Sequence, residues 1–151
     1  MKAESAMEGG FSGATTLTIL HEMVRKFSPD APRMDEIGKQ GLAKVFDKLK
    51  LDVPDDDQLY LIATGLELLT NGLYYSLAGA GNKNNVLAKG AILGLLAGIG
   101  AVTLPGKLGL DERASSRTPK TAVMTVAYYF VGGIIAAAVA KRIEERRNGP
   151  R

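Results

Sequence analysis

The chain has 151 residues, enough for one domain, and a net charge of +3 at neutral pH. Hydrophobic residues make up 46% and charged residues 23%, values that suit a membrane protein and a helical soluble protein equally well. Cysteine is absent and His21 is the only histidine, which excludes a disulfide framework, a thiolate metal site and any site that needs two histidines from one chain.

The charges are unevenly distributed along the chain. Residues 90–106 and 121–140 contain no charged side chain, and residues 59–82 contain only Glu67. Lysines and arginines flank these apolar segments instead of forming a basic stripe interleaved with aromatics, so the pattern favours a membrane over nucleic acid. The sequence therefore predicts one all-α membrane domain over residues 1–151, with three or four transmembrane helices and one amphipathic loop helix.

The first predicted span covers residues 10–27. Its uncharged part, residues 11–20, is shorter than the roughly 20 residues that a transmembrane helix requires. The segment can cross a bilayer only if His21 and Glu22 face other helices and Arg25 and Lys26 lie at the headgroups, which is why the predicted number of spans is three or four.

An amphipathic helix is predicted over residues 34–51, after a turn that contains Pro29 and Pro32. Its apolar residues recur at spacings of three to five and its lysines lie mostly off that stripe. Such a helix can lie at the membrane surface or dock on a partner, or it can pack on its own protein. The sequence leaves these interpretations open.

The second span is predicted over residues 58–80. Tyr60, Tyr74 and Tyr75 lie toward its two ends, where aromatic rings prefer the membrane interface. A short polar turn, residues 81–85, is expected to follow.

The third span is predicted over residues 86–104 and is expected to end at Pro105. Gly90, Gly94 and Gly98 recur at four-residue spacing, a pattern that lets helix backbones approach closely in lipid. The row can pack helices within one chain, its commoner use, or build a homo-oligomer around a pore.

The last span is predicted over residues 121–140, which carry no charge. Gly132 and Gly133 favour close packing, and the aromatic residues 128–130 lie near the middle, where we expect them to contact other helices. A charged tail, residues 141–151, is expected to continue the helix and then fray. With four spans, eight lysines and arginines fall on one side and eleven on the other, a difference too small to orient the protein.

Glu67 is the candidate functional residue, because an ionisable group inside a span is costly. Asn71 lies four residues on, on the same helical face, and His21 and Glu22 could meet that face from the first helix. These residues could form a proton relay or a small cation site. The plainer interpretation, which we favour, is a hydrogen-bonded cluster that fixes the helix packing, with Glu67 either charged or protonated. Adjacent His and Glu residues point about 100° apart on a helix, so no metal site is expected.

One resemblance rests on the order of several features. The first helix runs into residues 21–22, residues 31–35 read Ala-Pro-Arg-Met-Asp, a glycine-rich span ends in Leu-Pro-Gly-Lys-Leu-Gly-Leu at 104–110, and tyrosines lie in the last span. In this order the chain resembles the small uncharacterised bacterial inner-membrane proteins of the YagU-like kind. The resemblance covers most of the chain and implies a four-helix membrane protein with no known activity and no functional residues to carry over.

Three functions follow as hypotheses. The first is an accessory or structural subunit of a bacterial inner-membrane complex, whose partners are the lipid bilayer and other membrane subunits or copies of itself. The second is a homo-oligomeric channel or small permease that uses Glu67. The third is a soluble bundle, although a chain of this length can hardly shelter two helices that are apolar all round. No catalytic residue, enzyme activity or cofactor is expected, because no such motif is found in the sequence.

Overall fold

The computed structural model describes residues 1–81 and 83–149. Every regular element among them is helical, as the sequence predicts. The elements are α1 (Ala3–Arg25), α2 (Met34–Lys48), α3 (Asp56–Ser76), the 3-10 turns η1 (Leu77–Gly79) and η2 (Lys83–Asn85), α4 (Val86–Lys107), α5 (Arg113–Ser116) and α6 (Pro119–Asn148). Asn82, in the predicted polar turn, and Pro150 and Arg151, in the predicted tail, lie outside the described residues.

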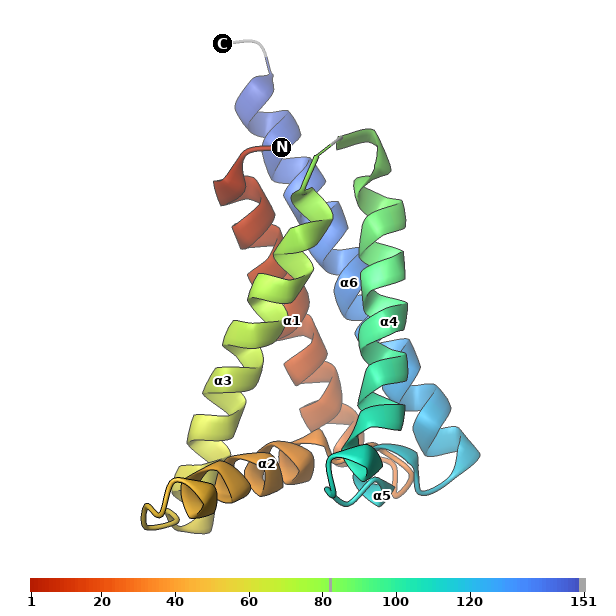
Figure 1. Cartoon of the computed structure of the whole chain (residues 1–151). Coiled ribbons are helices and arrows are strands. Elements are labelled where there is room, and N and C mark those ends of the chain that lie inside the picture. The colour runs from red at the N-terminus through yellow and green to blue at the C-terminus, as the bar shows by residue number, and fades with distance from the viewer. Residues whose placement is uncertain (82, 150–151) are drawn as a thin grey trace.

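The four long helices α1, α3, α4 and α6 run along one bundle axis (Figure 1). α6 lies against α1 and α4 along most of its length, whereas α3 lies against α1 and touches α4 at few positions. Both chain ends lie at one end of the bundle, which we call the terminal end. α2 runs across the opposite end, where α5 also lies; we call this the loop end.

Glycines bring α4 and α6 into backbone contact. A Cβ atom at Gly94 would lie 2.6 Å from the carbonyl oxygen of Tyr129, closer than real side chains come. One turn before Gly94, Gly90 lies against Gly133. One turn after Gly94, Gly98 lies against Val126. The glycine row is therefore buried against α6 of the same chain, and this face is not available to line a pore.

A second glycine contact corrects the predicted start of the first helix. Gly9 and Gly13 of α1 lie against α6, where a Cβ at Gly13 would meet the carbonyl oxygen of Gly132. α1 begins at Ala3 and not near residue 10, and its early residues, such as Ser5, are buried. The sequence pattern missed this start because the contact with α6, far away in sequence, stabilises the first turns.

The predicted end of the third helix is also wrong. α4 continues through Pro105 to Lys107, because the fixed φ of proline is close to that of a helix and the next N–H groups still donate into the helix, as that of Leu108 does to Leu104 (3.0 Å). The helix ends in a Schellman motif at Gly109, whose φ is +68°. The N–H of Leu110 donates to the carbonyl of Pro105 (2.9 Å), and that of Gly109 donates to Gly106 (3.1 Å).

Smaller differences occur at two other boundaries. α2 ends at Lys48 and not at residue 51, and α3 ends at Ser76, with most of the predicted remainder forming η1. The charged tail continues the last helix as predicted, since α6 runs without a break for 30 residues to Asn148.

Tyr75 corrects a prediction about the interface aromatics. It is only 1% exposed, and its hydroxyl donates to the backbone carbonyl of Tyr129 over 2.9 Å. Tyr74 is half-buried and its hydroxyl donates to the carbonyl of Leu93 on α4 (3.1 Å). These two tyrosines therefore attach α3 to α6 and α4, since the hydrogen bond of a buried hydroxyl outweighs the interface preference of the ring.

α2 combines the two interpretations that the sequence left open. Its first half is docked on its own protein, with Met34 buried and Ile37 packed against the core. Its second half and the following loop expose large apolar side chains, among them Val45, Leu49 and Leu51. The apolar stripe is thus covered at one end and exposed at the other.

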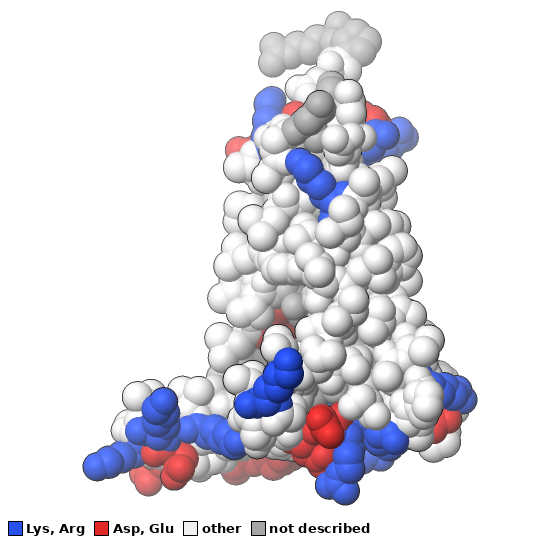
Figure 2. All heavy atoms as spheres, turned by 45° about the vertical axis from the view of Figure 1, so that its right-hand side comes forward, with Lys and Arg blue, Asp and Glu red and all other residues white. Residues whose placement is uncertain are grey.

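Two helices, α4 and α6, are long and apolar enough to cross a membrane. In the most apolar 18-residue stretch of each helix, only 22% of α4 and 33% of α6 is buried. Most of each stretch therefore faces outward. Figure 2 shows the same distribution on one face, where a broad band without lysine or arginine separates two charged ends. Among the described residues, α1 and α3 are of similar length to α4 but are not apolar enough to belong with these two helices.

Candidate functional site

Three of the four predicted cluster residues face one small cavity near the loop end. His21 and Glu22 enter from α1, and Glu67 enters from α3. The cavity has a volume of about 20 Å³. Its other lining residues are Thr18, Arg25, Pro32, Asp35 and Thr64.

Asn71, the fourth predicted member, does not line this cavity. It lies one turn beyond Glu67 on α3 and lines a groove between α3 and α4, together with Tyr74, Ala97 and Tyr129. Asn71 nevertheless adjoins the cluster, because its side chain hydrogen-bonds Tyr129, whose ring also contacts His21.

Arg25 organises the charged side of the cavity. Its guanidinium donates to Asp35 at the start of α2 (2.6 Å) and to Glu22 one turn earlier on α1 (2.9 Å). The hydroxyl of Tyr60 on α3 donates to the second oxygen of Glu22 (3.2 Å). These bonds join α1, α2 and α3 at the loop end.

His21 lies on the apolar side of the cavity. Its ring contacts the rings of Tyr128 and Tyr129 on α6, with centroids 5.4 and 5.9 Å apart. His21 Nε2 and Glu67 Oε1 are buried and have no hydrogen-bond partner among the described residues. Hydrogen bonds therefore join the helices through Glu22, and these two atoms take no part in them.

The roles of Arg25 and Asp35 were not predicted from the sequence. Arg25 is expected at the lipid headgroups, because lysine and arginine at the end of a span usually lie there, but it pairs with Glu22 and Asp35 instead. Arg25 follows Glu22 by three residues, a spacing that allows a salt bridge on one helix. This spacing could have predicted the pairing of the two residues. Nothing local indicates that Asp35 would be the second partner, because the turn at residues 28–33 decides where α2 begins.

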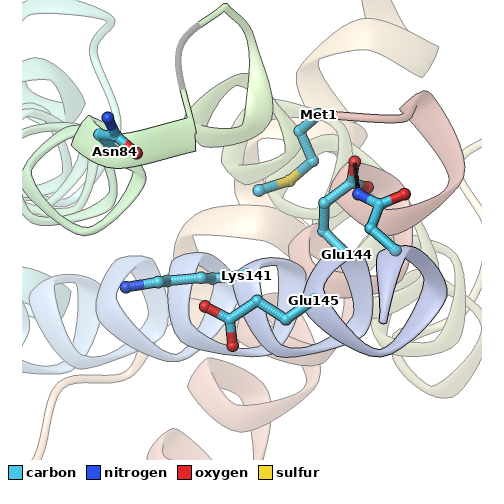
Figure 3. Close-up of a pocket in the computed structure, with 6 residues that line it drawn as sticks. Met1, Asn84, Lys141, Glu144 and Glu145 are labelled. Atoms are coloured by element: carbon cyan, nitrogen blue, oxygen red, sulfur yellow. Dashed lines mark hydrogen bonds between the residues drawn. The ribbon is translucent and has the colours of Figure 1, made fainter. Parts of the chain in front are cut away.

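A second cavity lies at the terminal end and has a volume of about 230 Å³. Figure 3 shows Lys141, Glu144 and Glu145 along α6, with Met1 and Asn84 reaching the cavity from other segments. Asn148 donates to Glu144 over 3.0 Å, so part of the polar lining is already bonded to itself.

Glu144 is held by backbone as well as side-chain donors. Its carboxylate accepts a hydrogen bond from the backbone N–H of Lys2 (3.1 Å), and this bond, with others, lowers the pKa of Glu144 to about 2. Nearby, Arg147 donates to both Glu4 and Glu8 of α1. The charged end of α6 thus fastens the first turns of α1.

The chemistry open to the cluster near the loop end is narrow. A cavity of about 20 Å³ holds no organic substrate, but it exceeds the roughly 10–15 Å³ that one water needs. Within residues 1–81 and 83–149, no three His, Asp or Glu side chains converge in a way that could hold a metal ion.

Comparison with known proteins finds no matching family, no matching curated protein and no matching solved structure. The resemblance to YagU-like proteins therefore stays a prediction from the order of sequence features.

Proposed function

We propose that the protein is an integral membrane bundle of four spans, in the bacterial inner membrane, that serves as an accessory or structural subunit of a larger membrane complex. The observation that carries the proposal is the distribution of exposed large apolar side chains. They occur on every long helix, as with Met7 on α1, Leu66 on α3, Leu96 on α4 and Val123 on α6. Exposed apolar surface on this scale indicates a bilayer or a protein partner.

The charge distribution supports four spans in preference to two. Glu67 apart, the charged residues of α1, α3, α4 and α6 lie toward the two ends of the bundle. α1 and α3 extend between the same two ends of the bundle as α4 and α6, so a bilayer that covers α4 and α6 would cover them at the same depth. His21 and Glu22 are turned toward other helices, the condition under which the first segment can cross.

The accessory role is supported by the tight packing of the interior of the bundle. Helix packing accounts for the buried glycines, and the cavity beside His21 and Glu67 is too small for an organic solute. The outward leucines of α3, including Leu66, Leu69 and Leu73, form an apolar face that a neighbouring membrane helix could cover.

The number of spans can be tested directly, because the chain has no cysteine. Single cysteines at Lys48 and Arg113 report the loop end, and single cysteines at Ala80 and Arg146 report the terminal end. With four spans, a membrane-impermeant maleimide applied to sealed vesicles labels one pair and not the other. Labelling of all four sites before lysis contradicts the four-span bundle, and recovery of the protein in the supernatant without detergent would show a soluble bundle.

The accessory role is tested by the native mass of the protein, extracted from its own membranes in mild detergent at natural abundance. We expect reproducible co-migration with larger proteins, well above the 16.0 kDa of one chain. Leu66→Ala with Leu73→Ala should weaken that co-migration if α3 is the covered face, and Leu95→Ala with Ile99→Ala on α4 is the matched control. A protein that always runs alone contradicts the accessory role.

A channel or permease is the second candidate, and the unpartnered Glu67 Oε1 is the observation in its favour. It requires a discrete homo-oligomer and a flux that Glu67→Gln abolishes while the assembly is retained. An unchanged flux in that variant would remove Glu67 from any transport mechanism.

A further inference from the structure

Two unpartnered groups from different helices meet in the interior of the bundle. Nε2 of His21 on α1 and Oε1 of Glu67 on α3 are both buried, and both residues line the small cavity near the loop end. His21 is only 7% exposed. Buried polar atoms almost always have a hydrogen-bond partner, and a pair of unmet ones at a shared cavity indicates a bound species between them.

The size and lining of the cavity select that species. A volume of about 20 Å³ accommodates one water and excludes a hydrated ion or an organic ligand. A buried water needs two to four polar partners, and Thr18 and Thr64 line the cavity beside the two unpartnered atoms. One water there would satisfy both His21 Nε2 and Glu67 Oε1.

The charges around the cavity do not balance without bound protons. Three carboxylates, those of Glu22, Asp35 and Glu67, face a single guanidinium, that of Arg25. Arg25 already pairs with Glu22 and Asp35 at 2.9 and 2.6 Å, so no cation is left for Glu67. A carboxylate with a buried oxygen and no cation beside it is costly, and a proton on Glu67 or on His21 reduces this cost.

The groups that face His21 and Glu67 from the other packed elements do not remove this requirement. α6 contributes the uncharged rings of Tyr128 and Tyr129, and the Tyr60 hydroxyl of α3 is bonded to Glu22. Asp35 of α2 adds a further negative charge.

We propose that His21 and Glu67 form a proton-binding site, in which one water in the cavity bridges Nε2 of His21 to Oε1 of Glu67 and lets the two groups share an exchangeable proton. The proton comes from bulk water at the loop end, where Glu22 is partly exposed, and returns there. Only O–H and N–H bonds form and break. The proposal goes beyond the accessory role and does not depend on it.

His21 is the only histidine, so its imidazole nitrogens give the only histidine side-chain signals in a protein labelled with ¹⁵N-histidine. The full chain in lipid nanodiscs would be stepped through pH while the nitrogen signals and the infrared carbonyl band of protonated carboxylic acids are recorded. We expect a persistent cross-peak between the His21 ring and water, and a movement of the His21 signals in the same pH step that changes the Glu67 band. No water contact at His21 in the wild-type chain would overturn the proposal without any variant.

Glu67→Gln keeps the shape of the side chain and removes the ionisable group. It should abolish the infrared band, move the His21 signals at fixed pH and reduce the protons bound in the step by one. His21→Gln should shift the Glu67 band in return. Glu144→Gln, a carboxyl change at the terminal end, is the matched control and should leave both signals in place. Independent behaviour of His21 and Glu67 in folded variants would contradict a shared site.

Discussion

α6 and α3 are held in the bundle differently. α6 meets both of its neighbours, α1 and α4, through glycines, so its backbone lies against theirs and a larger side chain at these glycines would clash. α3 has such a contact only with α1, where a Cβ at Gly10 would meet the carbonyl oxygen of Gly72. It is attached to α6 and α4 by the hydroxyls of Tyr75 and Tyr74, and a groove of about 570 Å³ separates part of it from α4. The difference teaches that the glycine contacts tolerate no added atom, whereas the attachments of α3 to α4 and α6 can be weakened one at a time.

The largest effect is expected where an added side chain would force α4 away from α6. Gly94→Val places carbon atoms within 2.6 Å of the Tyr129 carbonyl, and overpacking of this kind should lower the free energy of unfolding by about 3 kcal/mol. Gly100→Val on the same helix adds the same atoms next to Leu104 at 3.5 Å and is the control. Thermal unfolding in detergent, followed by circular dichroism, would show whether the two variants differ in stability. An equal loss of stability in both would contradict the tight contact at Gly94.

A smaller loss is expected where α2 supports the base of α1 and α3. Asp35→Ala removes the 2.6 Å charged hydrogen bond to Arg25 and should cost about 1.5–2 kcal/mol. The outer ion pair of α2, from Lys39 to Asp56, involves an aspartate whose side chain is 77% exposed, so Asp56→Ala should cost less than about 1 kcal/mol. Denaturant unfolding of the two variants measures the difference, and a reversed order would show that α2 is held mainly at its outer half.

Tyr75→Phe tests a single attachment of α3. The change removes the hydroxyl that donates to the Tyr129 carbonyl in the core and should cost about 1 kcal/mol. Tyr74→Phe removes a bond that is only partly buried and should cost less. The distance between spin labels on α3 and α4 would show in addition whether the groove between them widens. If Tyr75→Phe leaves the free energy of unfolding unchanged, this hydrogen bond does not hold α3 in place.

The smallest effect concerns the terminal end, where Glu144 on α6 holds the backbone of Lys2 ahead of α1. The pKa of Glu144 is lowered to about 2 by that hydrogen bond, so its stabilisation is present above the ordinary value of about 4.5 and is lost as pH falls toward 2. Glu144→Gln should therefore lower the melting temperature at pH 7, with a difference that shrinks between about pH 4.5 and 2. A difference that stays constant over this range would contradict a role for the charge.

The sequence predicts what depends on short-range pattern. The uncharged stretches give the positions of α4 and α6, and helical spacing places His21 and Glu22 on one helix and Glu67 on another with faces that can meet. The glycine row indicates a close helix contact, although the spacing alone does not say whether the partner lies in the same chain.

The parts that the sequence missed depend on distant contacts. α1 starts early because its glycines meet α6, and Tyr75 is buried because α3 leans on α6. Arg25 turns to Asp35 because the proline-containing turn brings α2 under the cavity. The place of Asn71 in the groove has the same origin, since the position of α4 decides which part of α3 lines it.

The unequal lengths of α4 and α6 have a consequence for the way the bundle would sit in lipid. At about 1.5 Å per residue, the 22 residues of α4 match a hydrocarbon thickness of about 30 Å, while the 30 residues of α6 reach about 45 Å, through the headgroup layer. In the membrane that we propose, α4 sets the hydrophobic match and α6 stands in the headgroups at the terminal end. In a bilayer of different thickness, the bundle would change its tilt. The change in tilt would alter the depth of the cavity beside His21 and Glu67 below the membrane surface at the loop end.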